Sequence, residues 1–204
     1  MKKIMMTLAA VCVAATMNAQ GYVGGSLTFL NSTDKTNPAA EVTRTTFAIA
    51  PEFGYKLDDK LGVGIVLGFG TGKVKTENTT VNPNVSVESK ATTFTIQPYL
   101  RYQALTAGKF NVFVDGGLNF ATTSAENMKS AMDFGLFVSP GISYDVNEKW
   151  TIAAHLNNMF TFGYHKDAIA DVDNAPDAPS SISAGLSTGG FTLGSLSFGV
   201  YYNF

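Results

Sequence analysis

Residues 45–55 read TTFAIAPEFGY, and this stretch is the clearest indicator of the fold. Large apolar side chains occupy every second position from Phe47 to Tyr55, and small or polar residues fill the positions between them. A period of two residues is typical of a β-strand whose two faces meet different environments. The strand predicted here covers residues 43–57.

The same pattern returns twice along the chain. Residues 92–102 read TTFTIQPYLRY and residues 134–144 read FGLFVSPGISY, and in each copy a proline precedes a tyrosine by four residues. A short turn, a lysine and an apolar residue follow each copy, so the unit is a hairpin of roughly 45 residues. A propeller blade needs four strands per unit. This unit contains two, which argues against a propeller.

Extended to the whole chain, the alternation predicts eight antiparallel strands that are joined by alternately short and long connections. The predicted strands are 20–31, 43–57, 60–71, 91–104, 109–121, 132–146, 149–163 and 190–204. The short turns are Asp58-Asp59, Thr106-Ala107-Gly108 and Asn147-Glu148, and the long polar loops are 32–42, 72–90, 122–131 and 164–189. Short turns at one rim and long loops at the other are typical of bacterial outer-membrane barrels, whose long loops lie outside the cell.

The composition favours a membrane setting over a soluble one. Charged residues make up 15% of the 204 residues, against about 25% in ordinary soluble domains. No stretch after the N-terminal region approaches 18 consecutive apolar residues, and only helices or closed barrels satisfy their backbone in lipid. A membrane-spanning form of this chain must therefore be a closed barrel. The net charge of −2 and the lack of a basic stripe argue against nucleic acid as a partner.

The N-terminal region has the layout of an export signal. Lys2 and Lys3 precede an apolar run over 4–15, which is too short to span a bilayer, and Ala19 offers a small residue at a cleavage site. We therefore predict a cleaved signal peptide over 1–19 and an outer-membrane β-barrel over 20–204.

Two other interpretations of this region are less consistent with the residues. One is a buried N-terminal helix. The other is a lipoprotein modified at Cys12, but Val11 is too bulky for that cleavage site and the apolar run continues past it. Cys12 is the single cysteine of the chain, so disulfide bonds play no part in the predicted mature protein.

The two columns of side chains indicate which face of the sheet is outside. The bulky column supplies about five large residues per strand, and an eight-stranded barrel encloses little more space than ordinary side chains fill. The bulky column must therefore face lipid, and the column of glycines and polar residues must line the lumen, where Gly leaves space for a facing Tyr99, Phe137 or Tyr201. A soluble lipocalin-like barrel would need the reverse arrangement.

Aromatic residues gather near both ends of the predicted strands, as in the girdles of membrane barrels. A β-sandwich core is the alternative explanation for them. The group beside the short turns is Tyr55, Tyr102, Tyr144, Trp150 and Phe204, and the group near the long loops is Phe47, Phe69, Phe94, Phe120, Phe134 and Phe160.

Three prolines interrupt the strand pattern at matching positions, Pro51, Pro98 and Pro140. A proline removes one hydrogen bond from a ladder, so we expect a β-bulge or a kink at each. A bulge would move Glu52 and Gln97 out of the inner column.

The last eight residues, SFGVYYNF, carry the most specific pattern of the chain. With this ending, the predicted mature chain resembles the outer-membrane protein β-barrel domain family, in the same class as the opacity-type and OmpA-like barrels. The resemblance implies an all-β, eight-stranded, antiparallel up-and-down transmembrane β-barrel in the bacterial outer membrane, surrounded by outer-membrane lipid. It also implies a C-terminal signal that the barrel-assembly machinery reads, formed by Ser197, Gly199, Tyr202 and Phe204.

The predicted inner column contains a cluster of ionisable residues. Charges in a narrow, partly dry interior must pair, because each unpaired charge costs several kcal/mol. We predict the pairs Glu52 with Arg101 and Lys56 with Asp145, which would form a salt-bridged plug; a polar gate, a narrow ion path or a proton-transfer site are the alternatives. The predicted lumen polar cluster is Glu52, Lys56, Arg101, Asp115, Asp145 and His155, with Gln97, Asn119 and Asn157 nearby.

The sequence provides no motif for catalysis, a metal or a cofactor. His155 and His165 are the two histidines, and neither belongs to a recognisable serine–histidine–carboxylate arrangement. The loop carboxylates could bind Ca²⁺ only weakly, because the run lacks the glycine and the distal glutamate of an EF-hand. These carboxylates are Asp167, Asp171, Asp173 and Asp177.

The sequence therefore favours a protein that is not an enzyme and that acts through its architecture. The first hypothesis is a structural or surface-interaction protein with long extracellular loops, a largely plugged lumen and a host or surface ligand bound through the loops. The alternative is a narrow porin-like channel for ions or small solutes.

Overall fold

The computed structural model describes residues 20–36, 40–78, 86–126, 128–156, 159–169, 177–186 and 196–204. This part of the chain forms ten β-strands. They are β1 (Gly21–Asp34), β2 (Ala40–Lys56), β3 (Leu61–Asn78), β4 (Ser86–Ala107), β5 (Phe110–Ala125), β6 (Ala131–Asp145), β7 (Trp150–Leu156), β8 (Phe160–Lys166), β9 (Ser180–Leu186) and β10 (Leu196–Asn203). Within these ranges no helix is long and apolar enough to cross a bilayer.

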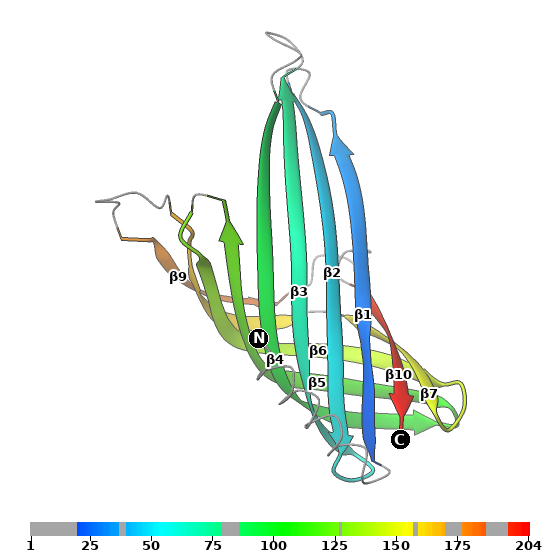
Figure 1. Cartoon of the computed structure of the whole chain (residues 1–204). Coiled ribbons are helices and arrows are strands. Elements are labelled where there is room, and N and C mark those ends of the chain that lie inside the picture. The colour runs from blue at the N-terminus through cyan, green and yellow to red at the C-terminus, as the bar shows by residue number, and fades with distance from the viewer. Residues whose placement is uncertain are drawn as a thin grey trace, which may run out of the picture.

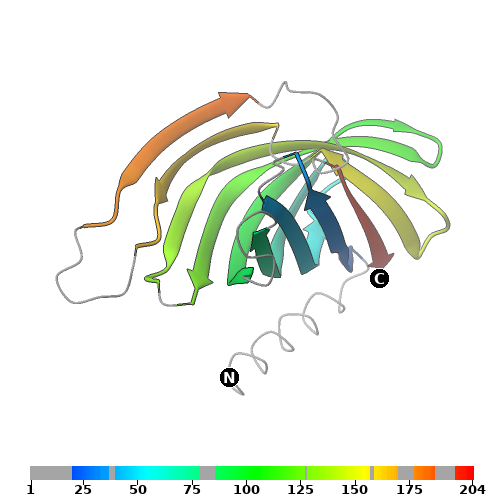
Figure 2. The same cartoon turned by 90° about the horizontal axis from the view of Figure 1, so that it is seen from above.

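The strands form a closed, eight-stranded antiparallel β-barrel. Neighbours in sequence pair from β1 to β6, β6 pairs with β7, β7 with β10, and β10 with β1, which closes the ring. Figure 1 shows β1 to β4 rising side by side, with β10 beside the lower part of β1. From above, the sheet curls so that β10 lies between β1 and β7 (Figure 2).

The first six predicted strands agree with β1 to β6, and most of their ends differ by a few residues. The main difference is that strands extend into stretches predicted as loops: β3 continues to Asn78 and β4 begins at Ser86. Those extensions are polar, and the alternation of Lys73, Val74 and Lys75 provides only a weak strand signal. The two extensions form strands because they pair with each other.

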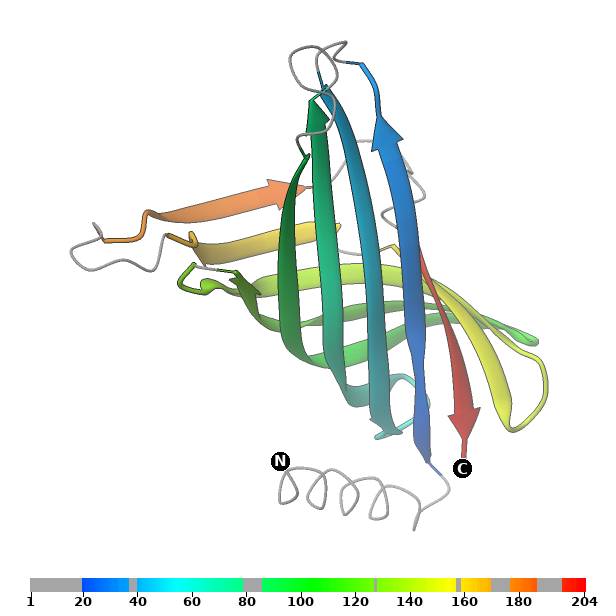
Figure 3. The ribbon, with the colours of Figure 1, turned by 45° about the horizontal axis from the view of Figure 1, so that its top comes forward.

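The predicted strand 149–163 and the predicted loop 164–189 were wrong in detail, whereas β10 lies within the predicted strand 190–204. The predicted strand 149–163 is divided into β7, which pairs with the turn-side half of β6, and β8, which pairs with its loop-side half. Residues 180–186, predicted as loop, form β9 beside β8 (Figure 3). The sequence of β9, SSISAGL, has little strand propensity, so the strand depends on its partner. The predicted signal peptide, 1–19, lies outside the described residues.

The two faces of the barrel differ as the alternation predicts. Phe47, Phe69 and Leu100 point outward and are 48%, 50% and 60% exposed, whereas Glu52 and Tyr99 point inward and are each 5% exposed. The apolar column therefore forms the outer surface, and the small or polar column lines the interior.

Large aromatic rings fit inside the barrel because glycines lie opposite them on neighbouring strands. The ring of Tyr22 lies over Gly54, and the ring of Tyr99 lies over Gly64. A Cβ atom at either glycine would overlap the ring. In the same way, the ring of Phe113 lies over Gly141 and the ring of Tyr201 lies over Gly24.

The prolines do not create the bulges expected at Pro51 and Pro98. The ladder between β2 and β3 is interrupted at Pro51, but the register is the same on both sides of it, and the ladder between β4 and β5 behaves in the same way at Pro98. Glu52 and Gln97 therefore stay in the inner column. At Pro140 the strand paired with β6 changes from β8 to β7. Three steps along β6, from Val138 to Gly141, correspond to five steps from Phe160 to His155, so the segment opposite Pro140 is longer by two residues. The register shift within the β4–β5 pair lies instead between Gln103 and Leu105.

Two of the short turns share one local design. In the first, the Oδ1 atom of Asp58 accepts hydrogen bonds from the backbone N–H groups of Lys60 (2.7 Å) and Leu61 (2.8 Å). In the second, Oδ1 of Asn147 accepts the corresponding bonds from Lys149 and Trp150, both at 2.9 Å. The turn before β5 instead uses Gly108, whose φ of 63° suits a glycine.

Substitution of Gly64 by alanine should destabilise the barrel, because the new Cβ would overlap the ring of Tyr99. Overpacking of this kind costs about 1–3 kcal/mol. The measurement is urea unfolding in lipid vesicles, followed by the fluorescence of the single tryptophan. Gly72→Ala, on the same strand and face but with open space around it, is the matched control and should unfold like wild type. Equal stability of the two variants would contradict the packing argument.

The Asp58 turn should make stability depend on pH at the acidic end. Hydrogen bonds from the N–H groups of Lys60 and Leu61 lower the pKa of Asp58 below its ordinary value of 3.8. The stabilisation is complete above pH 3.8 and is lost as the pH falls through the lowered pKa.

Unfolding free energies measured from pH 6 to pH 2 should show this loss in wild type and in Asp59→Asn. They should not show it in Asp58→Asn, which keeps a neutral acceptor as Asn147 does. A parallel pH profile for Asp58→Asn and wild type would refute the assignment.

Candidate functional site

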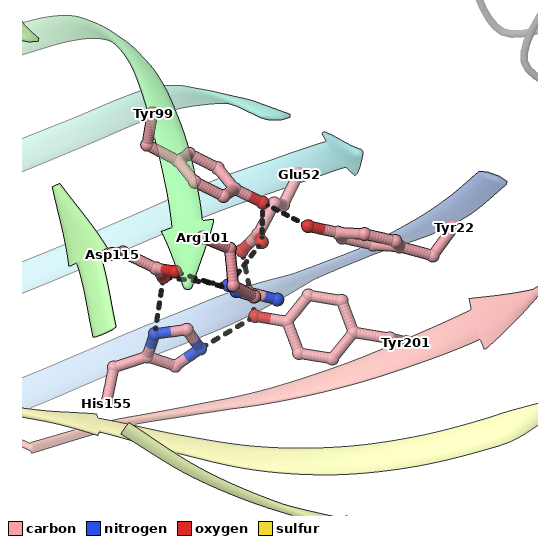
Figure 4. Close-up of polar contacts among 7 residues, drawn as sticks. All are labelled: Tyr22, Glu52, Tyr99, Arg101, Asp115, His155 and Tyr201. Carbon is pink, nitrogen blue, oxygen red and sulfur yellow. Dashed lines mark hydrogen bonds and ion pairs between the residues drawn. The ribbon is translucent and has the colours of Figure 1, made fainter. Parts of the chain in front are cut away.

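Seven inward side chains meet at one level of the barrel and form a continuous polar cluster (Figure 4). They come from six strands, because the registers place inner positions of β1, β2, β4, β5, β7 and β10 side by side. We call this cluster the lumen network; it consists of Tyr22, Glu52, Tyr99, Arg101, Asp115, His155 and Tyr201.

Arg101 is the centre of the lumen network. Its Nε and Nη2 atoms donate to the two carboxylate oxygens of Asp115 at 2.7 Å and 2.8 Å, and Nη2 also donates to Oε1 of Glu52 at 3.1 Å. Its guanidinium carbon lies 4.3 Å from the centre of the Phe113 ring, a cation–π arrangement. One cation thus serves two carboxylates.

Glu52 accepts hydrogen bonds from two tyrosines as well as from Arg101. The hydroxyl of Tyr99 donates to Oε1, and the hydroxyl of Tyr201 donates to Oε2 at 2.8 Å. The hydroxyl of Tyr22 lies 2.6 Å from that of Tyr99 and extends the chain of bonds to β1. Both oxygens of this buried carboxylate are therefore satisfied.

His155 joins the carboxylate of Asp115 to the hydroxyl of Tyr201. Its Nδ1 atom lies 3.5 Å from Oδ2 of Asp115, and its Nε2 atom lies 2.9 Å from the hydroxyl oxygen of Tyr201. Both ring nitrogens of His155 thus face oxygen atoms, so this side chain links β7 to β5 and to β10 within the lumen network.

The lumen network lies between two cavities. The cavity on the side of the short turns has a volume of about 310 Å³, and the cavity on the side of the long connections has a volume of about 430 Å³. Arg101 and Tyr22 line the first, Glu52, Asp115 and His155 line the second, and Tyr201 lines both. A single layer of hydrogen-bonded side chains therefore separates the two cavities.

Two members of the predicted lumen cluster, Lys56 and Asp145, line the turn-side cavity but do not belong to the lumen network. The predicted pair Lys56 with Asp145 was wrong: the structure gives no ion pair between them in the part of the chain it describes. Asp145 instead accepts hydrogen bonds from Asn111 (2.9 Å) and Thr151 (2.6 Å), while Lys56 is exposed at the turn-side rim. The carboxylate of Asp145 accepts hydrogen bonds from side chains on β5 and β7, so it needs no cation.

The predicted polar neighbours of the cluster have separate places. Gln97 donates to Asn119 at 2.9 Å, beside the interrupted ladder between β4 and β5. Asn157 lies outside the described residues.

The sequence analysis missed Tyr22 and Phe113 as lumen residues. Both are buried, with exposures of 5% and 1%. Their signal is present but weak: each occupies an inner-column position and has a glycine on the adjacent strand. The pairing of those strands had to be known before the glycines could be assigned to the rings.

A second histidine cluster lies at the loop-side rim. The Nδ1 atom of His165 lies 2.6 Å from Oδ1 of Asp133, and its Nε2 atom lies 2.9 Å from Oδ1 of Asp167. Each ring nitrogen therefore faces a different carboxylate. Across the residues the structure covers, no three histidine, cysteine or acidic side chains are arranged to hold a metal ion. Asp171 and Asp173 of the predicted acidic loop lie outside the described ranges.

The C-terminal strand β10 holds three residues of the predicted assembly signal, and the fourth, Phe204, follows its end. Gly199 is buried and Phe204 is exposed, and the ring of Tyr202 contacts those of Trp150 and Phe204 at centroid distances of 5.2 Å and 5.3 Å. Ser197 lies on the inner face beside the loop-side cavity. Their role in assembly stays a prediction.

The comparisons with known proteins agree with this architecture. The family model described as "Outer membrane protein beta-barrel domain" matches residues 4–204. The outer membrane protein OprG of Pseudomonas aeruginosa is similar in structure, with a TM-score of 0.50, 14% identity, and coverage of 91% of this chain and 96% of that chain.

Two further solved structures are more distantly similar. Outer Membrane Protein W of E. coli gives a TM-score of 0.42 at 17% identity, over 91% of this chain and 98% of that chain. Neisserial surface protein A gives a TM-score of 0.40 at 15% identity, over 91% of this chain and 95% of that chain. No curated protein matches the chain in sequence.

Replacement of Arg101 by methionine should destabilise the protein by about 3–5 kcal/mol, because Glu52 and Asp115 would remain buried without a cation. The triple variant Arg101→Met, Glu52→Gln, Asp115→Asn removes those charges and should recover most of the loss. Urea unfolding monitored by tryptophan fluorescence measures both. Arg44→Met, at the chain's other arginine, which is exposed, is the control and should be neutral. An unfolding free energy for Arg101→Met equal to that of the control would exclude this role for Arg101.

Proposed function

The chain belongs to the outer membrane protein beta-barrel domain family, and we propose that it is a structural or surface-interaction protein of the bacterial outer membrane with a largely plugged lumen. It spans the membrane through its apolar outer column. It would act through the loop-side ends of its strands, by supporting the envelope or by binding a host or surface ligand. It carries out no catalysis in this proposal.

The observation that carries the proposal is the lumen network. Its side chains separate the two cavities and are joined to one another across six strands, so that no member can move without breaking a hydrogen bond or an ion pair. Hydrogen bonds to charged groups are worth about 1.5–3 kcal/mol each. A layer of this kind supports a closed interior and a rigid barrel more than it supports a conduit.

The loop-side end is the surface left for interaction. Strands β3 and β4 continue as a paired ribbon from Phe69 and Phe94, near the loop-side aromatic group, to Asn78 and Ser86. We place this end outside the cell, since long connections face the exterior in bacterial barrels. The C-terminal signal for the assembly machinery would then act at the opposite rim, beside the short turns.

A narrow channel for ions or small solutes is the second candidate. The two cavities favour it, because they already extend from both rims to the lumen network. Only that one layer would have to open. The two candidates therefore differ in a single respect: whether the lumen network stays closed under physiological conditions.

Conductance in planar bilayers distinguishes them. Wild type should show no steady current, while Arg101→Ala should open a small, cation-selective pore, because Glu52 and Asp115 would remain as uncompensated negative charges. Arg44→Ala, at the exposed loop end of β2, should stay closed.

Steady conductance of wild type equal to that of Arg101→Ala would favour the channel instead. Closure of both would show that Arg101 does not seal the lumen. Heat-modifiable gel migration establishes that each variant is folded.

A further inference from the structure

The outer face of β3 and β4 changes character beyond the loop-side aromatic group. Below this point the outward positions hold apolar residues such as Phe69 on β3 and Phe94 on β4, which pair with each other. Further along the same face, the outward positions become charged. We call this set the lysine patch; it consists of Lys73, Lys75 and Glu77 on β3 and Glu88 and Lys90 on β4.

The lysine patch carries an uncompensated positive charge. Lys73 and Lys90 are directly opposite each other in the β3–β4 register, an arrangement that is unfavourable for like charges. Both contact the single carboxylate of Glu88, at 2.6 Å and 3.1 Å. Lys75 pairs with Glu77. Two ammonium groups therefore share one carboxylate and leave room for a further anion.

The side chains of this lysine pair are open to the outside of the barrel. That of Lys90 is 66% exposed and that of Lys73 is 47% exposed. Because Glu88 contacts both, the two ammonium groups are already held close together. An anion could bind them without first bringing two flexible chains into one place.

The backbone of the lysine pair lies just beyond the headgroup layer, and the long lysine side chains can reach back into it. Lys73 follows Phe69 by four residues, which is about 10 Å along the membrane normal for a strand tilted by roughly 40°. Headgroups occupy about 5–8 Å beyond each side of the hydrocarbon core. Thr71 and Thr92, which pair with each other, fill the level between. On this outward face, the material beside the lysines is lipid headgroup and not lumen water.

The patch lies on one side of the barrel only. At comparable outward positions, β5 carries Thr122 and Ser124 and β6 carries Met132. Within the strands described on that side, Lys166 at the end of β8 is the charged residue at an outward position. The lysine patch therefore has a definite place on β3 and β4.

We infer that Lys73 and Lys90 bind a phosphate group of an outer-leaflet glycolipid headgroup, between β3 and β4 just beyond the loop-side aromatic group. A lysine binds phosphate as a compact point charge, and two of them side by side match its multiple anionic oxygens. Lysines near an anionic membrane surface are attracted to it, so loss of both should weaken binding roughly tenfold or more.

The inference rests on the proposed orientation of the barrel, which can be tested separately. Apart from Cys12 the chain has no cysteine, so single cysteines can be introduced at the loop side (Lys129→Cys) and in a short turn (Asp59→Cys). A membrane-impermeant maleimide applied to intact cells should label the first variant and not the second. The reverse pattern would refute the orientation, and with it the leaflet, without bearing on phosphate binding itself.

Native mass spectrometry of the folded barrel in detergent tests the site. The probes are monophosphorylated lipid A and the same lipid after removal of its phosphate. Wild type should retain the phosphorylated lipid at about tenfold lower concentration than the dephosphorylated one. Lys73→Gln with Lys90→Gln should lose that preference, Lys73→Arg with Lys90→Arg should keep it, and the matched control Lys35→Gln with Lys129→Gln should resemble wild type.

Three results would overturn the inference. The first is an equal preference in the Lys73→Gln, Lys90→Gln variant and its control, and the second is equal retention of both lipids by wild type. The third is displacement of the lipid by millimolar inorganic phosphate, which would indicate a site for a free anion. Heat-modifiable migration confirms that each variant is folded.

Discussion

Inside a bilayer, every backbone N–H and C=O group must find its hydrogen-bond partner within the protein. The ring that closes through the pairing of β10 with β1 meets this requirement in the turn-side half of the barrel. The prolines are tolerated because each interrupts only one of the two ladders of its strand, without a change of register at Pro51 or Pro98. Beside one such gap, Gln97 and Asn119 bond through their side chains and hold the strands together.

Closure with eight strands leaves a narrow interior, and the size of that interior determines what can line it. Rings such as Tyr22 and Tyr99 fit because Gly54 and Gly64 leave space beneath them. The hydroxyl of Tyr99 then donates to Glu52, a carboxylate that would be costly to bury alone, and the hydroxyl of Tyr22 bonds to that of Tyr99. The glycines that permit close packing and the ions that need partners are therefore parts of one arrangement.

The sequence by itself determined the strand period, the outward apolar column, the short turns and the presence of ionisable residues in the inner column. These features follow from local alternation and from the volume that eight strands can enclose. It also indicated the ion pair of Glu52 with Arg101, which the structure contains at 3.1 Å. It failed where the signal was not local: β9 has little propensity of its own, and polar residues extend β3 beyond the apolar band.

Only the tertiary structure decided which inner side chains share a level. Register placed Asp115 opposite Arg101 and brought His155 and Tyr201 to them from strands that are distant in sequence. The same registers gave Asp145 the polar neighbours Asn111 and Thr151, and not Lys56. A shift of one residue in any pair would have exchanged the inner and outer faces, so the partners of a buried charge depend on the closed ring as a whole and not on any single strand.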